Sequence, residues 1–220
     1  MRITICGLAA SGKSTIARLL AIRYRLVYVG LGSIFRAVGM LALREKRGLS
    51  AISENEMRRR IAYRWDVHEA KIKIDGGDIM ESLQNPAVAE ITARMLAQSE
   101  NWSTLIRFCN SIMESYENVV CEGRNAGIEF LPYADIKCAL VAELPVRIAR
   151  RHAELQAKGK SLSYGEIERQ IKERDEMDTR RRYAPFRIPH GATVMDTSHR
   201  SIEECISVLS DNTVWTHGEV

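Results

Sequence analysis

Eight residues near the start of the chain, Gly7-Leu8-Ala9-Ala10-Ser11-Gly12-Lys13-Ser14, constrain the fold more than any other stretch. They match the phosphate-binding loop pattern G-x-x-x-x-G-K-[ST] without a mismatch. An apolar run, Ile3 to Cys6, precedes the loop, and an amphipathic run, Thr15 to Tyr24, follows it. The sequence therefore predicts a strand, a tight loop and a helix whose N-terminus faces an anion. A glycine-rich turn without a ligand is the alternative.

The residue types in this loop suit a chain of phosphates. Glycines at both ends let the backbone wrap round the phosphates, so that successive N–H groups point at the negative charge. Lys13 can then reach the outer phosphates, and the Ser14 hydroxyl can complete the coordination of a Mg²⁺. We expect a nucleoside triphosphate to be bound by Gly7, Ala9, Ala10, Ser11, Gly12, Lys13, Ser14 and Thr15.

Length and charge bound the remaining possibilities. A chain of 220 residues can bury one good core with a small subdomain attached. The net charge of +4 suits anionic substrates but is too small to argue for nucleic acid as a partner. No apolar run approaches the roughly 20 residues that span a bilayer, and Arg2 leads directly into a strand rather than a signal peptide. We expect no nucleic-acid partner, no membrane partner and a monomer.

The five cysteines are odd in number, widely spaced and mostly set in apolar runs. This usage is typical of buried thiols in a reducing compartment rather than of a disulfide or zinc framework. The five histidines form no metal-ligand spacing. We therefore expect a cytoplasmic protein.

Continuous apolar runs alternate with amphipathic ones along the chain. Such alternation is typical of an α/β fold with an open parallel sheet, in which ligands lie at the carboxyl ends of the strands. Strands are predicted at Ile3–Cys6, Leu26–Val29, Asn118–Cys121, Ile136–Val141 and Thr193–Asp196. Helices are predicted at Thr15–Tyr24, from Ser33 towards Leu43, from about Ser53 to Ile61, and over Pro86–Met95, Ser103–Glu114, Pro145–Gln156 and Ile202–Leu209. A small β excursion over Val67–Ile74 is also expected.

Basic residues concentrate in the last third of the chain, well after the phosphate loop. They include Arg147, Arg150, Arg151, Lys172, Arg174, Arg180, Arg181, Arg182 and Arg187. Phosphoryl transfer between two anionic substrates needs such a surplus, and a segment that closes over them would supply it on binding. No N-K-x-D motif of a GTPase occurs. The acidic residues interspersed among these arginines leave a solvated helix face as the alternative.

The residues also resemble a known family. Several segments occur in the order seen in cytidylate kinases, and the likeness runs from Arg2 to about Leu209. These segments are Gly7–Thr15, Gly32–Val38, Glu122–Gly127, Phe130–Lys137, Lys172–Asp175 with Asp178, Arg181 and Ala184-Pro185, and Met195–Ser198 with Ser201–Glu204. The resemblance implies a P-loop kinase fold with a five-stranded sheet. Its parts would be a core (about 1–41, 101–157 and 188–210), a monophosphate-binding insert (about 42–100) and an arginine-rich lid (about 158–187).

The resemblance also implies roles. Lys13 would hold the phosphates of ATP and Ser14 the Mg²⁺. Arg150 and Arg174 would face the transferring phosphoryl group, and with Lys13 they form the expected catalytic set. Glu122 stands where the family more often has Asp; it could hold a Mg²⁺-bound water, orient Arg124, or form a structural salt bridge.

On the acceptor side, Arg36 and Arg124 would clamp the phosphate of a nucleoside monophosphate, a task suited to the planar arginine fork. Asp178 and Arg181 match positions that contact the acceptor's sugar. The acceptor implied is CMP, dCMP or a modified cytidylate.

Departures from the family pattern gather where the base should be recognised. Gly30 and Leu31 replace Asp and Ser, Asn125 replaces Asp, and Ala93 and Trp102 replace a Ser and an Arg that contact cytosine. Nearby polar candidates are Thr92 and Arg107. Trp102 could stack on a base or pack on a helix face.

Two further functions stay open at this point. One is a P-loop kinase for a different nucleotide or small phosphorylated acceptor, since the base positions are altered. The other is a nucleotide-binding regulator without turnover, which the intact Lys13 and Ser14 disfavour.

Overall fold

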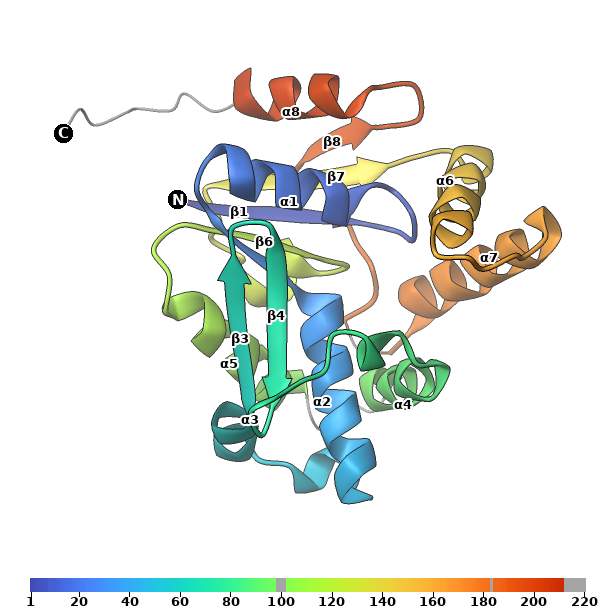
Figure 1. Cartoon of the computed structure of the whole chain (residues 1–220). Coiled ribbons are helices and arrows are strands. Elements are labelled where there is room, and N and C mark those ends of the chain that lie inside the picture. The colour runs from blue at the N-terminus through green and yellow to red at the C-terminus, as the bar shows by residue number, and fades with distance from the viewer. Residues whose placement is uncertain (98–101, 183, 212–220) are drawn as a thin grey trace.

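A five-stranded parallel sheet forms the centre of the chain in the computed structural model, which describes residues 1–97, 102–182 and 184–211 (Figure 1). Its strands, in the spatial order β2-β6-β1-β7-β8, are Val27–Gly30, Val119–Gly123, Arg2–Gly7, Ile136–Val141 and Thr193–Asp196. All four neighbouring pairs are parallel. The predicted open parallel sheet is thereby confirmed, with strand bounds that differ from the prediction by at most two residues at either end.

Strand β1 lies in the middle of this sheet and pairs with β6 on one side and β7 on the other. The carboxyl ends of the strands therefore bring three loops together: the phosphate loop after β1, residues 124–125 after β6, and the start of α6 after β7. The central strands β1 and β6 are almost fully buried, as expected for a parallel sheet covered on both sides, whereas the edge strand β8 is mostly exposed.

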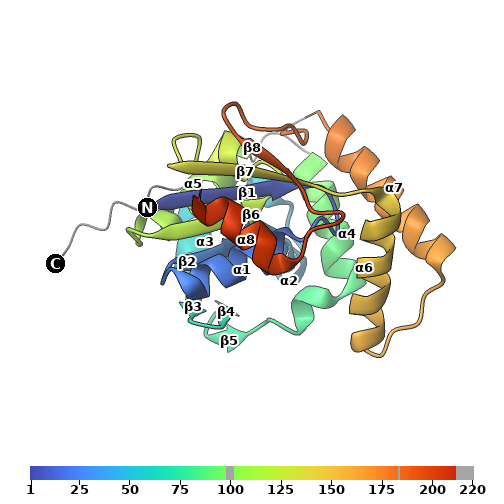
Figure 2. The same cartoon turned by 90° about the horizontal axis from the view of Figure 1, so that it is seen from above.

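Helices cover both faces (Figure 2). Helices α1 (Lys13–Arg23) and α8 (Ile202–Asp211) bury Ile16, Leu20 and Ile206 against one face. Helices α2 (Leu31–Glu45) and α5 (Trp102–Glu114) pack on the other, in a larger core. The predicted start of α2 near Ser33 is wrong by two residues, because Leu31 is buried as the first residue of the helix and Gly32 lies within it.

An antiparallel hairpin lies beside α2 (Figure 1). Its strands are β3 (Ile61–Asp66), β4 (Glu69–Ile74) and the short β5 (Gly77–Asp78). It is flanked by α3 (Glu54–Arg60), whose N-cap is Ser53, and by α4 (Pro86–Ala97). The predicted excursion began at Val67, which the structure corrects: Val67 has φ 43° and lies in the turn. The partner strand β3 was not predicted, because its first residue, Ile61, was assigned to the preceding helix.

Helices α6 (Leu144–Ala157) and α7 (Tyr164–Arg180) stand together at the carboxyl edge of the sheet (Figure 1). A small apolar cluster that includes Ile148, Leu155, Ile167 and Ile171 joins them. Helix α7 begins with a capping box, in which the Ser163 and Glu166 side chains bond reciprocally to backbone N–H groups. Residues 164–180 of the arginine-rich segment thus form one helix, and Arg181 and Arg182 follow its end.

Each of the five cysteines is buried with a free thiol. Burial raises the pKa of Cys6, Cys109, Cys121, Cys138 and Cys205 above its ordinary range. Among the described residues, none of the helices is both long enough and apolar enough to cross a membrane.

Candidate active site

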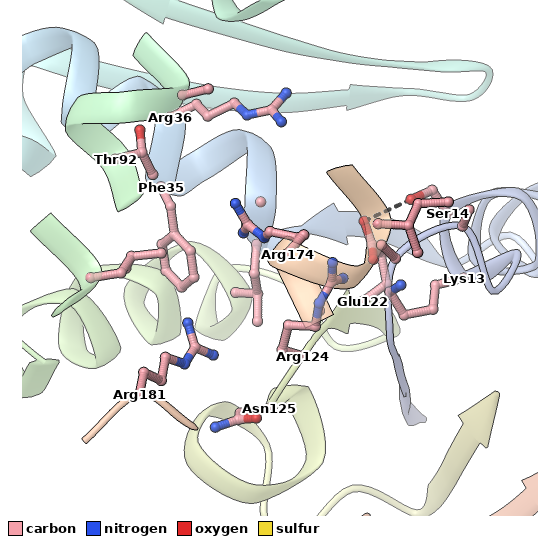
Figure 3. A pocket seen from close by; sticks show the side chains of 18 of the residues that line it. Lys13, Ser14, Phe35, Arg36, Thr92, Glu122, Arg124, Asn125, Arg174 and Arg181 are labelled. Carbon is pink, nitrogen blue, oxygen red and sulfur yellow. Dashed lines mark hydrogen bonds between the residues drawn. The ribbon is translucent and has the colours of Figure 1, made fainter. Parts of the chain in front are cut away.

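A cavity of about 580 Å³ opens at the carboxyl edge of the sheet. The phosphate loop, α2, the end of β6, and helices α4, α6 and α7 all contribute to its wall. Figure 3 shows Lys13, Ser14 and Glu122 on one side of the cavity and Phe35, Thr92 and Arg181 on the other, with Arg124 and Arg174 between them. Residues from distant parts of the sequence therefore share one chamber.

The phosphate loop has the backbone geometry that its sequence predicts. Gly12 has φ 90°, a left-handed conformation that side chains rarely adopt, and it directly precedes α1. At Gly7 an added Cβ would lie 2.4 Å from the backbone oxygen of Leu140. Any larger residue at position 7 would therefore push the loop away from β7.

Lys13 is almost fully buried at the base of this loop. Its Nζ donates a hydrogen bond of 2.6 Å to the backbone oxygen of Leu8. Burial, followed by the positive charge of Arg124, lowers the pKa of Lys13 to about 7. A phosphate chain in the cavity would supply the negative charge that this ammonium lacks.

Ser14 and Glu122 place two potential oxygen ligands for a metal ion side by side at the edge of the cavity. The Ser14 Oγ donates a hydrogen bond of 3.0 Å to Glu122 Oε1, drawn dashed in Figure 3. The Tyr28 Oη donates to the same oxygen at 3.1 Å. One hydroxyl and one carboxylate suit Mg²⁺, which prefers oxygen ligands and takes the remainder from phosphates and water. The residues therefore fit a Mg²⁺ ion bound with a nucleotide.

Sequence analysis left three roles open for Glu122. The bond to Ser14 places the carboxylate beside the predicted metal ligand rather than on Arg124, whose guanidinium pairs elsewhere. Across the described residues, no group of three or more His, Cys, Asp or Glu side chains could hold a metal by itself.

Asp178 is the anionic centre of an arginine cluster. Its carboxylate is only 3% exposed and accepts hydrogen bonds from Arg124 Nε at 2.6 Å and Arg174 Nε at 3.1 Å, while Arg181 Nη1 lies 3.8 Å away. Burial alone would raise the pKa of Asp178, but the charges of Arg124, Arg174 and Arg181 outweigh burial and lower it. One carboxylate thus holds three guanidinium groups at the cavity wall.

Arg36 is the fourth cavity arginine placed by the sequence analysis. It projects from α2, and burial together with the charges of Arg174, Arg151 and Arg124 lowers the pKa of its guanidinium. The excess of positive charge over negative charge in this wall favours an anionic ligand.

A second ion pair ties α7 to the phosphate loop. Asp175 accepts a 3.2 Å hydrogen bond from the Ala9 N–H and pairs with Arg147 Nη1. The same guanidinium donates to the Ala9 oxygen at 3.2 Å. In the sequence, Arg147 is only one of many arginines and Asp175 only part of a motif. Nothing local in the sequence could have paired them, since 28 residues separate the two side chains.

The structure does not bring Arg150 into the cavity, where the sequence analysis expected it beside Arg174. Its Nη1 donates to the Oγ1 of Thr197 at 2.9 Å instead, and this buried hydroxyl in turn donates to the Ser11 oxygen of the phosphate loop. Arg151, one residue later, lines the cavity. Because successive residues of a helix point in different directions, the spacing of arginines could not separate these two.

An aromatic group lines the far end of the cavity. Phe35, Trp102 and Phe130 pack with ring centroids 5.7–6.3 Å apart, and the Arg181 guanidinium lies 5.5 Å from the Trp102 centroid. Trp102 is 8% exposed, so it both packs in the core and borders the cavity. Sequence analysis did not select Phe35 or Phe130, although both lie in its quoted motifs.

Polar candidates near these rings divide into two groups. Thr92 lines the cavity, although its hydroxyl already donates a hydrogen bond of 2.6 Å to the backbone oxygen of Val88. Ala93 does not line this cavity. The expectation for Arg107 is wrong: its Nε pairs with Glu54 at 2.7 Å on the surface.

Asn125 and Leu31 occupy two of the altered positions. Asn125 is 3% exposed and lines the cavity, and no residue in the described part of the chain donates a hydrogen bond to its Oδ1. Leu31 packs against the backbone of Gly123, where an added Cβ would lie 2.8 Å from a Leu31 methyl group. Leu31 therefore fills space that a smaller polar residue would leave open.

Taken together, the cavity has a loop and a lysine for a phosphate chain, oxygen ligands for a divalent cation, and arginines for a second anion. Such an arrangement can neutralise charge on a moving phosphoryl group and exclude water from it.

Comparison with known proteins agrees with this chemistry. The chain matches the family model described as cytidylate kinase over residues 3–213. A cytidylate kinase from Carboxydothermus hydrogenoformans is 36% identical over 215 residues, which is 95% of this chain and 95% of that protein. A cytidylate kinase from Thermotoga maritima is 34% identical over 206 residues, 93% of each chain. An uncharacterized protein from Eubacterium ventriosum shares the fold, with a TM-score of 0.50 at 11% identity over 96% of this chain and 97% of that one.

Proposed function

The chain belongs to the cytidylate kinase family, and on that basis we propose that it transfers the γ-phosphoryl group of ATP·Mg²⁺ to CMP or dCMP. The reaction yields ADP and the nucleoside diphosphate. The comparisons do not favour a different acceptor class or a regulator without turnover.

The donor half of the site is assigned to the phosphate loop. Loop N–H groups from Ala10 to Thr15 bind the phosphates of ATP, whereas the Ala9 N–H is donated to Asp175. Lys13 contacts the outer phosphates. Ser14 would be a ligand for Mg²⁺, and Glu122 would accept a hydrogen bond from a water on the ion. The 3.0 Å bond between these two side chains supports this pairing. Mg²⁺, when bound, neutralises charge that develops between the outer phosphates.

The acceptor half is assigned to the arginine cluster around Asp178. Arg36 and Arg124 bind the monophosphate, and Arg174 neutralises the transferring group. Arg181, which lines the cavity, contacts the sugar, and the buried Asp178 holds this arginine in place. Trp102 and Asn125 border the base. Helix α7 and its flanks act as the lid, and the insert around the hairpin supports the acceptor side.

One observation carries the proposal: three arginines that line the same cavity as Lys13 converge on a single buried carboxylate, Asp178, in its wall. A cluster with more guanidinium groups than carboxylates binds a second anion opposite the triphosphate. Transfer then depends on position and electrostatics rather than on a covalent intermediate.

A coupled assay for ADP formation tests the proposal over a panel of ribo- and deoxyribonucleoside monophosphates. We expect CMP or dCMP to give the highest kcat/KM. Higher kcat/KM with a purine or uridine monophosphate would refute the cytidylate assignment. Absence of ADP formation with every acceptor would refute kinase activity. We further infer a monomer in the cytoplasm, which size-exclusion chromatography and cell fractionation would check.

A further inference from the structure

Glu122 receives hydrogen bonds from two hydroxyl groups that approach from different elements. Ser14 comes from α1, beside the cavity, whereas Tyr28 comes from β2, behind it. Tyr28 is 2% exposed and does not line the cavity. Its hydroxyl therefore reaches the carboxylate from the protein interior, where no nucleotide could touch it.

Gly30 makes this approach possible. It is paired with Glu122 in the register of β2 and β6, two residues beyond Tyr28 on the same strand. A Cβ added at Gly30 would lie 2.6 Å from the Tyr28 Oη and 3.1 Å from its ring. The tyrosine side chain thus extends over Gly30 to reach Glu122. This explains one of the altered positions: the residue there must lack a side chain.

The hairpin fixes the ring of Tyr28 in place. Trp65 of β3 packs on it with centroids 5.2 Å apart, and the Arg18 guanidinium lies 5.3 Å from its centroid. Tyr63, also of β3, donates its hydroxyl to the backbone oxygen of Tyr28. The position of the Tyr28 hydroxyl is consequently determined by the hairpin as well as by the sheet.

We propose that Tyr28 is a positioning residue that orients Glu122 toward the Mg²⁺ of the bound nucleotide, an inference that rests on the proposed function. Both hydroxyls bond to Oε1, and no described residue donates to Oε2. Oε2 therefore stays available to a metal-bound water. Mg²⁺ demands near-ideal geometry, and partners that orient its outer ligands commonly change metal affinity by about 10–100-fold.

The test measures ADP binding by calorimetry, with Mg²⁺ and with EDTA in its place, for the wild type and Tyr28→Phe. This substitution removes the hydroxyl and retains the ring that packs on Trp65. We expect binding in Mg²⁺ to weaken by about tenfold and binding in EDTA to stay within about twofold of wild type. Tyr24→Phe is the matched control: it removes a hydroxyl that pairs with Ser210, away from the cavity, and should change neither value.

Two results would overturn the proposal. Unchanged binding in Mg²⁺ would show that the hydroxyl does not orient the carboxylate, and equal weakening with and without Mg²⁺ would assign Tyr28 to packing alone. The measurement needs no acceptor. Its failure is therefore distinguishable from failure of the proposed kinase function, which the monophosphate panel reports for the wild type.

Gly30→Ala provides a second variant that keeps the hydroxyl, in case Tyr28→Phe does not fold. Its backbone φ of −94° accepts alanine without strain, so the methyl group acts by displacing the Tyr28 ring. We expect the same Mg²⁺-specific loss. Wild-type binding by this variant in Mg²⁺ would contradict the assigned role.

Discussion

The buried Lys13 makes nucleotide binding depend on pH in a way that can be measured. Its pKa is lowered from 10.5 to about 7, first by burial and then by the charge of Arg124. That difference disfavours the charged ammonium by about 5 kcal/mol in the free protein. Binding of ADP brings negative phosphates to Lys13 and restores the charged form. Nucleotide binding should therefore take up a proton above neutral pH.

The magnitude follows from the titration of one group. At pH 8.5, a lysine with a pKa of about 7 is neutral in roughly 97% of free molecules. Each ADP bound at that pH should therefore add close to one proton to the protein. By linkage, the affinity for ADP should fall almost tenfold for each pH unit above about 7 and vary little, on account of this group, below about 6.

Calorimetry in buffers of different ionisation enthalpy gives the proton uptake directly, as the slope of the observed binding enthalpy against buffer enthalpy. Lys13→Met removes the titrating group and retains a side chain of similar length, so its slope should be lower by about one proton. Lys73→Met, at an exposed position on β4, is the control and should match the wild type. Equal slopes for Lys13→Met and wild type would refute the assignment. Lys13→Ala should also reduce turnover by orders of magnitude in a folded protein.

Three further predictions concern the acceptor side and the lid. Arg124→Ala should raise the acceptor KM by about 10–100-fold, because a charged hydrogen bond to phosphate is lost, with the KM for ATP unchanged; an unchanged acceptor KM would contradict its role. The pKa of Asp178 lies below its ordinary 3.8, so its ionised form stabilises the fold above about pH 4, and this stability is lost as the pH falls further. In Asp178→Asn the free energy of unfolding should therefore depend less on pH in this range, and an acid transition identical to that of the wild type would exclude the effect. Asp175→Asn should lower kcat by about tenfold by weakening the hydrogen bond to Ala9. A wild-type kcat in steady-state kinetics would contradict this prediction.

Much of the fold was predictable because its signals are local. The parallel strands are short, continuous apolar runs, and each is bounded by helix or turn residues that the chain itself displays. The hairpin was only half predicted, since the residues of β3 follow a helix without a break and Tyr63 and Trp65 are compatible with either structure. A strand of this kind is decided by its partner, β4, rather than by its own composition.

The sequence by itself determined the phosphate loop, because Gly12, Lys13 and Ser14 act through local backbone geometry and side-chain reach at a fixed spacing. Only the tertiary structure decided which distant side chains share the cavity: it gathered Arg124 and Arg174 on Asp178, turned Arg150 away to Thr197, and placed Tyr28 behind Glu122. The physical reason is that such contacts join residues up to about a hundred positions apart, and strand order and helix rotation, neither of which is written locally, set their distances.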